Sequence, residues 1–168
     1  MPAYEEEIPL PAWLQLLLLA GLAGTAFAVI APAFSGLDGA GTYAVYYLAM
    51  AAALAAMVFA AATFRRLTIA IGEDDVRFGF GVLRKSIPLE RIQACEPTRY
   101  RWLTYGGWGI RFALGGRRAW SVPGVAGGVE FTVAEGKRVR RYFVSSRYPE
   151  LLAQCVGDRP GLPSAAPQ

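Results

Sequence analysis

Residues 39–80 read GAGTYAVYYLAMAAALAAMVFAAATFRRLTIAIGEDDVRFGF, and the two arginines in this stretch separate two kinds of structure. The uncharged residues before Arg65 outnumber the roughly 20 that a helix needs to cross a hydrocarbon core of about 30 Å. After Arg66, apolar residues occupy every second position of two segments joined by a GEDD turn, which predicts two antiparallel strands. These apolar positions are Leu67, Ile69, Ile71, Val76, Phe78 and Phe80. The chain therefore changes from membrane-spanning helix to β-structure within two residues.

A second uncharged run precedes this one and covers residues 8–37, with Asp38 as the only charged residue between the two runs. We place the membrane spans at residues 13–34 and 43–64, with aromatic rings near their ends, where such rings favour the membrane interface. These aromatic residues are Trp13, Tyr43, Tyr46 and Tyr47. Neither span contains Asp, Glu, Lys, Arg or His, which argues against an ion or proton path through this chain alone.

The basic residues predict the orientation of this hairpin. All 17 Lys and Arg residues follow residue 64, and Arg65 and Arg66 come directly after the second span. Because basic residues are retained on the cytoplasmic side, we expect a multi-pass protein of the plasma (inner) membrane with both termini in the cytoplasm. The N-terminus, MPAYEEE, lacks the positive region of a cleaved signal peptide.

Small residues recur every four positions in the first span, at Ala20, Gly24 and Ala28. Small side chains allow helices to approach closely in lipid. The pattern therefore favours contact between the two helices of the hairpin, with homodimerisation as the alternative.

Beyond Arg66 the sequence predicts about seven short strands and then one helix. Short strands with glycine turns continue to residue 145, which is typical of an antiparallel sheet that curls into a barrel or sandwich. The segment SSRYPELLAQCV has a proline suited to a first helical turn, followed by apolar Leu151, Leu152 and Val156 on one face. We assign the chain to four parts. They are an N-terminal segment (1–12), the hairpin (13–64), the β-domain (67–157) and a disordered Pro/Gly-rich tail (158–168).

Five strings carry a resemblance to a known family. They are LTIAIGEDDVRFGFG, IPLERIQACE, GGWGIRF, GVEF and SSRYPELLAQ. The region that contains them, roughly 90 residues, resembles the bacterial pleckstrin-homology-like (PH-like) domains found behind short membrane hairpins. This resemblance implies a membrane α-helical hairpin followed by an all-β PH-like barrel capped by one C-terminal α-helix. It implies fold and topology more than a reaction.

One turn departs from the lipid-binding members of that family. PH domains that bind phosphoinositides use basic residues around the turn between their first two strands. Here that turn is acidic, at Glu73, Asp74 and Asp75, and carboxylates would repel an anionic headgroup. Phosphoinositide binding of that kind is therefore not expected.

The composition gives little support for catalysis. The chain has no histidine, which removes the commonest general base and the commonest zinc ligand. Cys95 and Cys155 are far apart and have no metal-ligand spacing, so we expect reduced packing cysteines. No base can be named for Ser145 or Ser146, and the glycine-rich strings lack the phosphate-loop spacing. We expect no enzyme activity, no catalytic residue, no cofactor and no metal.

Basic and aromatic residues supply the candidate contact surface. The stretch YGGWGIRFALGGRRAW, residues 105–120, predicts a strand with Ile110, Phe112 and Leu114 on a buried face and a turn at Gly115–Gly116. Candidate contact residues for lipid or a partner lie in and around this stretch and in the later string KRVRR. They are Arg99, Arg101, Trp108, Arg111, Arg117, Arg118, Trp120, Lys137, Arg138, Arg140 and Arg141. These residues could bind anionic lipid or a protein partner, or they could be outward-facing strand positions that only aid solubility. Nucleic acid is a less expected partner.

Two hypotheses of function follow. In the first, the hairpin anchors a cytoplasmic PH-like domain that makes protein or anionic-lipid contacts without catalysis. In the second, the chain is an accessory subunit of a larger membrane enzyme or transporter, with the hairpin as its docking element.

Overall fold

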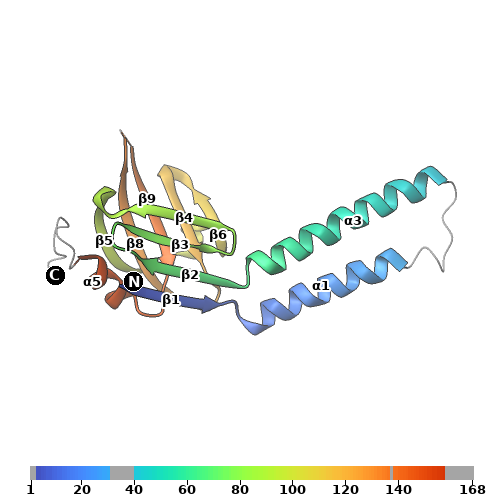
Figure 1. The fold of residues 1–168 in the computed structure, drawn as a ribbon, viewed down its shortest axis with the longest axis horizontal. Helices are drawn as coiled ribbons and strands as arrows, with labels where there is room; N and C mark the ends of the chain where they lie inside the picture. The colour runs from blue at the N-terminus through green and yellow to red at the C-terminus, as the bar shows by residue number, and fades with distance from the viewer. Residues whose placement is uncertain (1–2, 31–39, 137, 158–168) are drawn as a thin grey trace. The chain divides into compact units, whose positions relative to one another are not determined.

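The computed structural model describes residues 3–30, 40–136 and 138–157 of the 168-residue chain (Figure 1). The chain divides into two compact units. One is Pro11–Arg65, and the other, called the β-domain below, combines Met1–Leu10 with Arg66–Gln168. Lys137 and the tail predicted over residues 158–168 lie outside the described residues.

Pro11–Arg65 is a hairpin of two apolar helices, α1 (Ala12–Ile30) and α3 (Ala40–Thr63). Helix α1 has 19 residues, or about 28 Å at 1.5 Å per residue, close to the thickness of a hydrocarbon core. The apolar window of each helix has a mean hydropathy of 2.0 and none of it is buried. The predicted pair of apolar helices is confirmed, and their exposure indicates insertion into a membrane. Residues 31–34 of the first predicted span lie outside the described part of the chain.

The two helices contact each other through a small residue, although not through Gly24. A Cβ atom at Gly21 would lie 3.2 Å from the Met57 methyl carbon, whereas at Gly24 nothing would lie within 4 Å. The Tyr46 hydroxyl donates a hydrogen bond to the Ala28 carbonyl oxygen. The close contact therefore lies about one helical turn before the Gly24 position that the four-residue spacing indicated.

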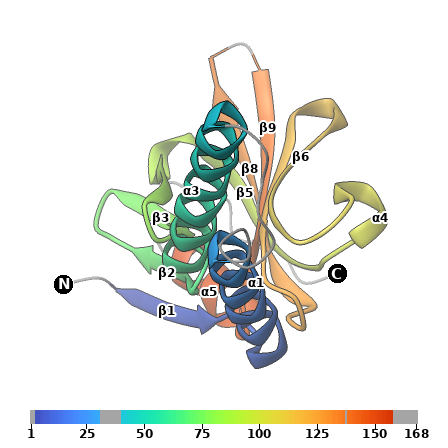
Figure 2. The same ribbon diagram turned by 90° about the vertical axis from the view of Figure 1, so that its right-hand side faces the viewer.

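The β-domain consists of two sheets (Figures 1 and 2). The first is fully antiparallel, in the order β1 (Tyr4–Pro9), β2 (Arg66–Ile71), β3 (Asp75–Phe80), β4 (Leu83–Pro88). The second has the order β5 (Ile92–Arg99), β8 (Gly127–Glu135), β9 (Arg138–Ser145), β7 (Arg117–Ser121), β6 (Gly109–Ala113). In this second sheet only the β7–β9 pair is parallel. A C-terminal helix, α5 (Pro149–Gly157), follows β9 and packs against β5 and β8.

Aromatic side chains from both sheets fill the space between them. The Phe78 ring of β3 lies 5.1 Å from that of Trp120 in β7, 6.1 Å from Phe131 in β8 and 6.3 Å from Tyr142 in β9, between ring centroids. All four side chains are buried, and burying each one stabilises the fold by about 1.5–3 kcal/mol. The alternating positions predicted in β2 and β3 are confirmed as core positions, each at most 2% exposed.

Two strands were not predicted. Strand β7 follows the predicted Gly115–Gly116 turn, and β1 lies in what was predicted as the N-terminal segment (1–12). In β1 the side chains alternate between exposed and buried, and Glu6 is one of the buried ones. Its carboxylate accepts hydrogen bonds from the Ser146 hydroxyl (2.7 Å), the Arg147 amide (2.8 Å) and the Tyr4 hydroxyl (2.7 Å). Glu6 therefore ties the first strand to the junction between β9 and α5.

The predicted closed barrel is not seen. Within the described ranges the strands form two separate sheets, and β4 and β5 are joined by a 3₁₀ turn (Leu89–Arg91) without pairing with each other. The structure confirms a β-rich domain with a C-terminal helix, while membership of the PH-like family stays a prediction.

One predicted face is wrong. Strand β6 and the turn after it were expected to bury Phe112 and Leu114, yet these side chains are 69% and 97% exposed. The reason is that β6 lies at the edge of its sheet, outside the aromatic cluster formed by β3, β7, β8 and β9, and none of its side chains is buried. The turn itself is as predicted, because Gly115 and Gly116 both have a φ of 75°, a conformation that glycine adopts without strain.

Candidate functional site

A group of exposed basic and apolar side chains surrounds the short helix α4 (Trp102–Tyr105), which connects β5 to β6. We call this group the α4 surface. It consists of Arg99, Arg101, Trp102, Leu103, Trp108 and Arg111. Figure 2 shows α4 and β6 on one side of the β-domain, opposite β1–β3.

Two tyrosines hold α4 against the outer face of the second sheet. The Tyr105 ring stacks on that of Tyr100 with 5.4 Å between centroids, and it lies 6.1 Å from the Phe143 ring of β9. The Tyr100 hydroxyl donates to the Gly107 carbonyl oxygen, which fixes the chain just after the helix. Burial raises the pKa of Tyr100, and burial together with Glu130 raises that of Tyr105 to about 12. Both phenols are therefore neutral near pH 7 and serve as anchors, not as acids or bases.

With the tyrosines turned inward, the other side chains of the loop point to solvent. Trp102, Leu103 and Trp108 are 50%, 90% and 45% exposed, and the two indole rings lie 6.4 Å apart. The helix ends at Gly106, whose φ of 71° reverses the chain. Exposed apolar side chains that lie together in this way form a candidate contact surface.

The arginines of the α4 surface carry uncompensated charge. Residues 97–129 contain five arginines and no acidic residue. Arg111 donates from Nε to the Trp108 carbonyl oxygen at 2.9 Å, and none of Arg99, Arg101 and Arg111 forms an ion pair with another described residue. The surface therefore combines exposed indoles with positive charge that is free to meet an anion.

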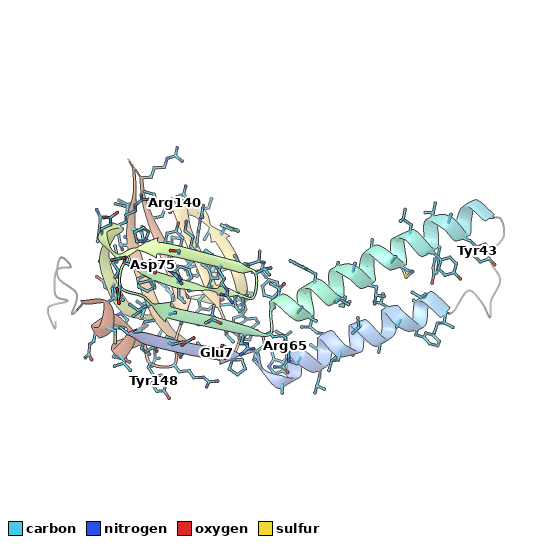
Figure 3. All side chains as sticks on the ribbon, viewed as in Figure 1. Glu7, Tyr43, Arg65, Asp75, Arg140 and Tyr148 are labelled. Atoms are coloured by element: carbon cyan, nitrogen blue, oxygen red, sulfur yellow. The ribbon has the colours of Figure 1, made fainter. Side chains whose placement is uncertain are left out.

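Other predicted contact residues lie elsewhere. Glu135, at the end of β8, is 2.9 Å from Arg140 and 3.7 Å from Lys85, and it accepts a 2.5 Å hydrogen bond from the Tyr142 hydroxyl. This hydrogen bond, with the nearby cations, lowers the pKa of Glu135. Arg118 belongs to the same group, since its guanidinium lies 5.8 Å from the Tyr142 ring centroid. Figure 3 shows Arg140 toward the end of the β8–β9 hairpin.

The remaining predicted residues do not complete one patch. Arg117 is half-buried and pairs in register with Arg141, whose guanidinium is 3.6 Å from Glu130. Arg138 is exposed, and Lys137 lies outside the described residues. Trp120 is a core residue, 5% exposed, so its assignment to a contact surface is corrected. The basic residues thus separate into the α4 surface, the Glu135 group and isolated positions.

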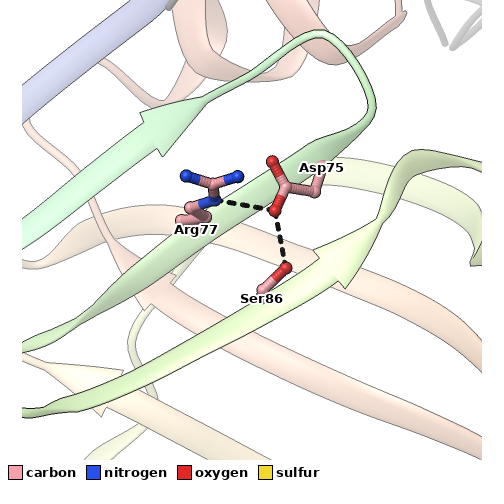
Figure 4. A network of polar contacts seen from close by, with 3 residues as sticks. All are labelled: Asp75, Arg77 and Ser86. Carbon is pink, nitrogen blue, oxygen red and sulfur yellow. Dashed lines mark hydrogen bonds and ion pairs between the residues drawn. The ribbon is translucent and has the colours of Figure 1, made fainter.

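The predicted acidic turn lines a shallow depression on the first sheet. Asp75 accepts hydrogen bonds from Arg77 Nε and from the Ser86 hydroxyl, both at 2.7 Å (Figure 4). These two contacts hold the pKa of Asp75 below its usual range. Among the described residues no group of three or more His, Cys, Asp or Glu is arranged to hold a metal ion. The Asp75 carboxylate is thus engaged in a local network that secures the β3–β4 pair.

Neither Trp102 nor Leu103 was among the predicted contact residues. Their exposure follows from a single helical turn, WLTY, that uses its tyrosine as the anchor and stops at glycine. A comparison with protein-family models, curated proteins and solved structures finds no match for this chain. Fold and site therefore define the class directly: a two-helix apolar hairpin combined with a two-sheet β-domain that carries a basic, indole-rich surface.

Proposed function

We propose that this chain is a non-enzymatic integral membrane protein whose β-domain binds the anionic surface of the membrane through the α4 surface. The observation that carries the proposal is the combination of exposed Trp102, Leu103 and Trp108 with three arginines that have no carboxylate partner among the described residues. Indole rings favour the headgroup region, and basic residues are attracted to anionic lipid. The arginines that follow the second helix support a cytoplasmic β-domain.

Connectivity favours this contact. Two residues separate β1 from α1, and two separate α3 from β2, so the β-domain is tethered by two short connections. Because the tether keeps the β-domain close to the membrane, binding to the membrane is effectively intramolecular. A surface with a low intrinsic affinity for lipid is then sufficient. Each arginine near an anionic surface contributes about 1 kcal/mol, and inserting an exposed leucine side chain contributes about 1.5–3 kcal/mol.

A reporter at residue 103 tests the proposal in the full-length protein. A Leu103→Cys variant, with Cys95 and Cys155 replaced by Ser, is labelled with an environment-sensitive fluorophore and placed in lipid nanodiscs. We expect blue-shifted emission in discs containing phosphatidylglycerol and solvent-like emission in discs of phosphatidylcholine alone. The control reporter is Val82→Cys, on the β3–β4 turn and 73% exposed, which should not distinguish the two lipids.

A charge variant completes the experiment. Replacing Arg99, Arg101 and Arg111 together by Gln should abolish the difference between the two kinds of disc, because the positive charge of the surface is lost. Identical emission of the Leu103→Cys reporter in both discs before this replacement would refute the proposal.

A further inference from the structure

The two sheets of the β-domain have four edges, formed by β1 and β4 in the first sheet and by β5 and β6 in the second. An edge strand presents unpaired backbone groups to which another strand can bind. Proteins block edges with charged side chains, proline or bulges, so an unblocked edge is a candidate binding site.

Three of the four edges carry such protection. Strand β1 has exposed Glu5 and Glu7 and ends at Pro9, and β4 carries the consecutive basic pair Arg84–Lys85 and ends in proline. Strand β5 has a register shift between its first residues and contains Pro97.

Strand β6 has neither a proline nor a bulge and carries only one charged residue. Its five residues, GIRFA, contain no proline, and they pair with β7 in unbroken register from Gly109↔Ser121 to Ala113↔Arg117. Its single charge is Arg111, which is exposed, and the neighbouring Phe112 is 69% exposed. In the described part of the chain, β6 makes no backbone hydrogen bond to any segment other than β7.

We propose that β6 binds an extended, acidic segment of a partner protein as an added strand of the second sheet. Charge complementarity selects this occupant, because the stretch of residues 97–129 around β6 has five arginines and no acid. Successive side chains point to opposite faces of a strand. Arg111 therefore meets a carboxylate on one face, while Phe112, whose ring lies 5.2 Å from the Arg118 guanidinium, meets an apolar side chain on the other.

A second copy of this chain is a poorer occupant of the same edge. Arg111 is the middle residue of β6. Antiparallel pairing of two copies about a two-fold axis at this residue would place two guanidinium groups opposite each other, which is destabilising. An acidic strand would instead place a carboxylate opposite Arg111, and these two groups attract each other.

Hydrogen exchange of the full-length protein in phosphatidylcholine nanodiscs tests this proposal without anionic lipid. The probe is a synthetic peptide in which glutamate alternates with valine, and the control peptide has lysine in place of glutamate. We expect the glutamate peptide to slow the exchange of β6 amides by about tenfold and to leave those of β2, an interior strand, unchanged. Unchanged β6 exchange, or equal protection by both peptides, overturns the proposal. Protection that rises with protein concentration without peptide also overturns it, in favour of a second copy.

Reversing the charge at residue 111 provides the decisive variant. The Arg111→Glu variant should bind the lysine peptide and no longer bind the glutamate peptide. The control is Arg91→Glu, which makes the same charge change at an exposed residue beside β5 and should behave as wild type. Phe112→Ser, which removes the apolar contact, should reduce protection by the glutamate peptide several-fold. Near-UV circular dichroism checks that each variant is folded. Because the Leu103 reporter needs anionic lipid and this assay contains none, failure of either proposal leaves the other intact.

Discussion

Removing the Glu6 carboxylate should destabilise the β-domain far more than its place in an acidic N-terminal string suggests. Glu6 is 7% exposed and accepts hydrogen bonds from the Ser146 hydroxyl, the Arg147 amide and the Tyr4 hydroxyl. Each buried donor left without a partner costs about 1–3 kcal/mol, so Glu6→Ala should lower the free energy of unfolding by about 3 kcal/mol. Glu6→Gln keeps one carbonyl acceptor and should cost about half as much.

Urea unfolding of the full-length protein in detergent, followed by near-UV circular dichroism, measures this effect, because the aromatic cluster that gives the signal lies between the two sheets. The matched control is Glu5→Ala, on the same strand and exposed, which should change the free energy of unfolding by less than about 0.5 kcal/mol. If Glu6→Ala and Glu5→Ala unfold at the same urea concentration, the carboxylate does not hold β1 to the β9–α5 junction and the reasoning fails.

Three further predictions concern the β-domain. The Tyr142 hydroxyl lowers the pKa of Glu135, so the ionised carboxylate contributes stability that is present above the ordinary glutamate pKa of about 4.3 and is lost as the pH falls below it; Glu135→Gln should flatten this part of the curve of melting temperature against pH. At Gly128 a Cβ atom would lie 2.4 Å from a backbone oxygen of β9, so Gly128→Ala should cost at least about 2 kcal/mol in urea unfolding, while Gly157→Ala, with nothing within 4 Å, should be nearly neutral. The Trp120 indole N–H is buried and has no hydrogen-bond partner among the described residues, so Trp120→Phe should change stability by less than about 1 kcal/mol in the same assay; a loss of several kcal/mol would reveal a missing partner.

The membrane hairpin and most strands could be predicted because their signals are local. An uncharged run of sufficient length predicts a spanning helix, and the alternation of Leu67, Ile69 and Ile71 predicts a strand with one buried face. These inferences need no knowledge of what lies across the sheet. The structure confirms two long, exposed apolar helices and the buried alternating positions.

The predictions of burial and exposure are wrong where the environment of a side chain is determined by residues distant in sequence. Glu6 is buried because Ser146 and Arg147, about 140 positions away, supply its donors. Phe112 is exposed because β6 lies at the edge of its sheet, outside the aromatic cluster between the sheets. The order of strands determines this position, and the alternation of residues does not. Within the candidate site, the basic and aromatic composition was predicted, but the separation of Arg118 and Arg140 from the α4 surface depends on the pairing of β7 with β9.

The pairing of β1 with β2 has a consequence for how the protein is made. Strand β1 is synthesised before both apolar helices, whereas its partner β2 follows them. If the helices span the membrane as proposed, the first sheet closes only when β1 and β2 lie on the same side of it. Insertion of both helices would then be a condition for completing the β-domain, and a chain that left one helix uninserted would display Ile8 and the unpaired edge of β2 to the quality-control machinery of the cell.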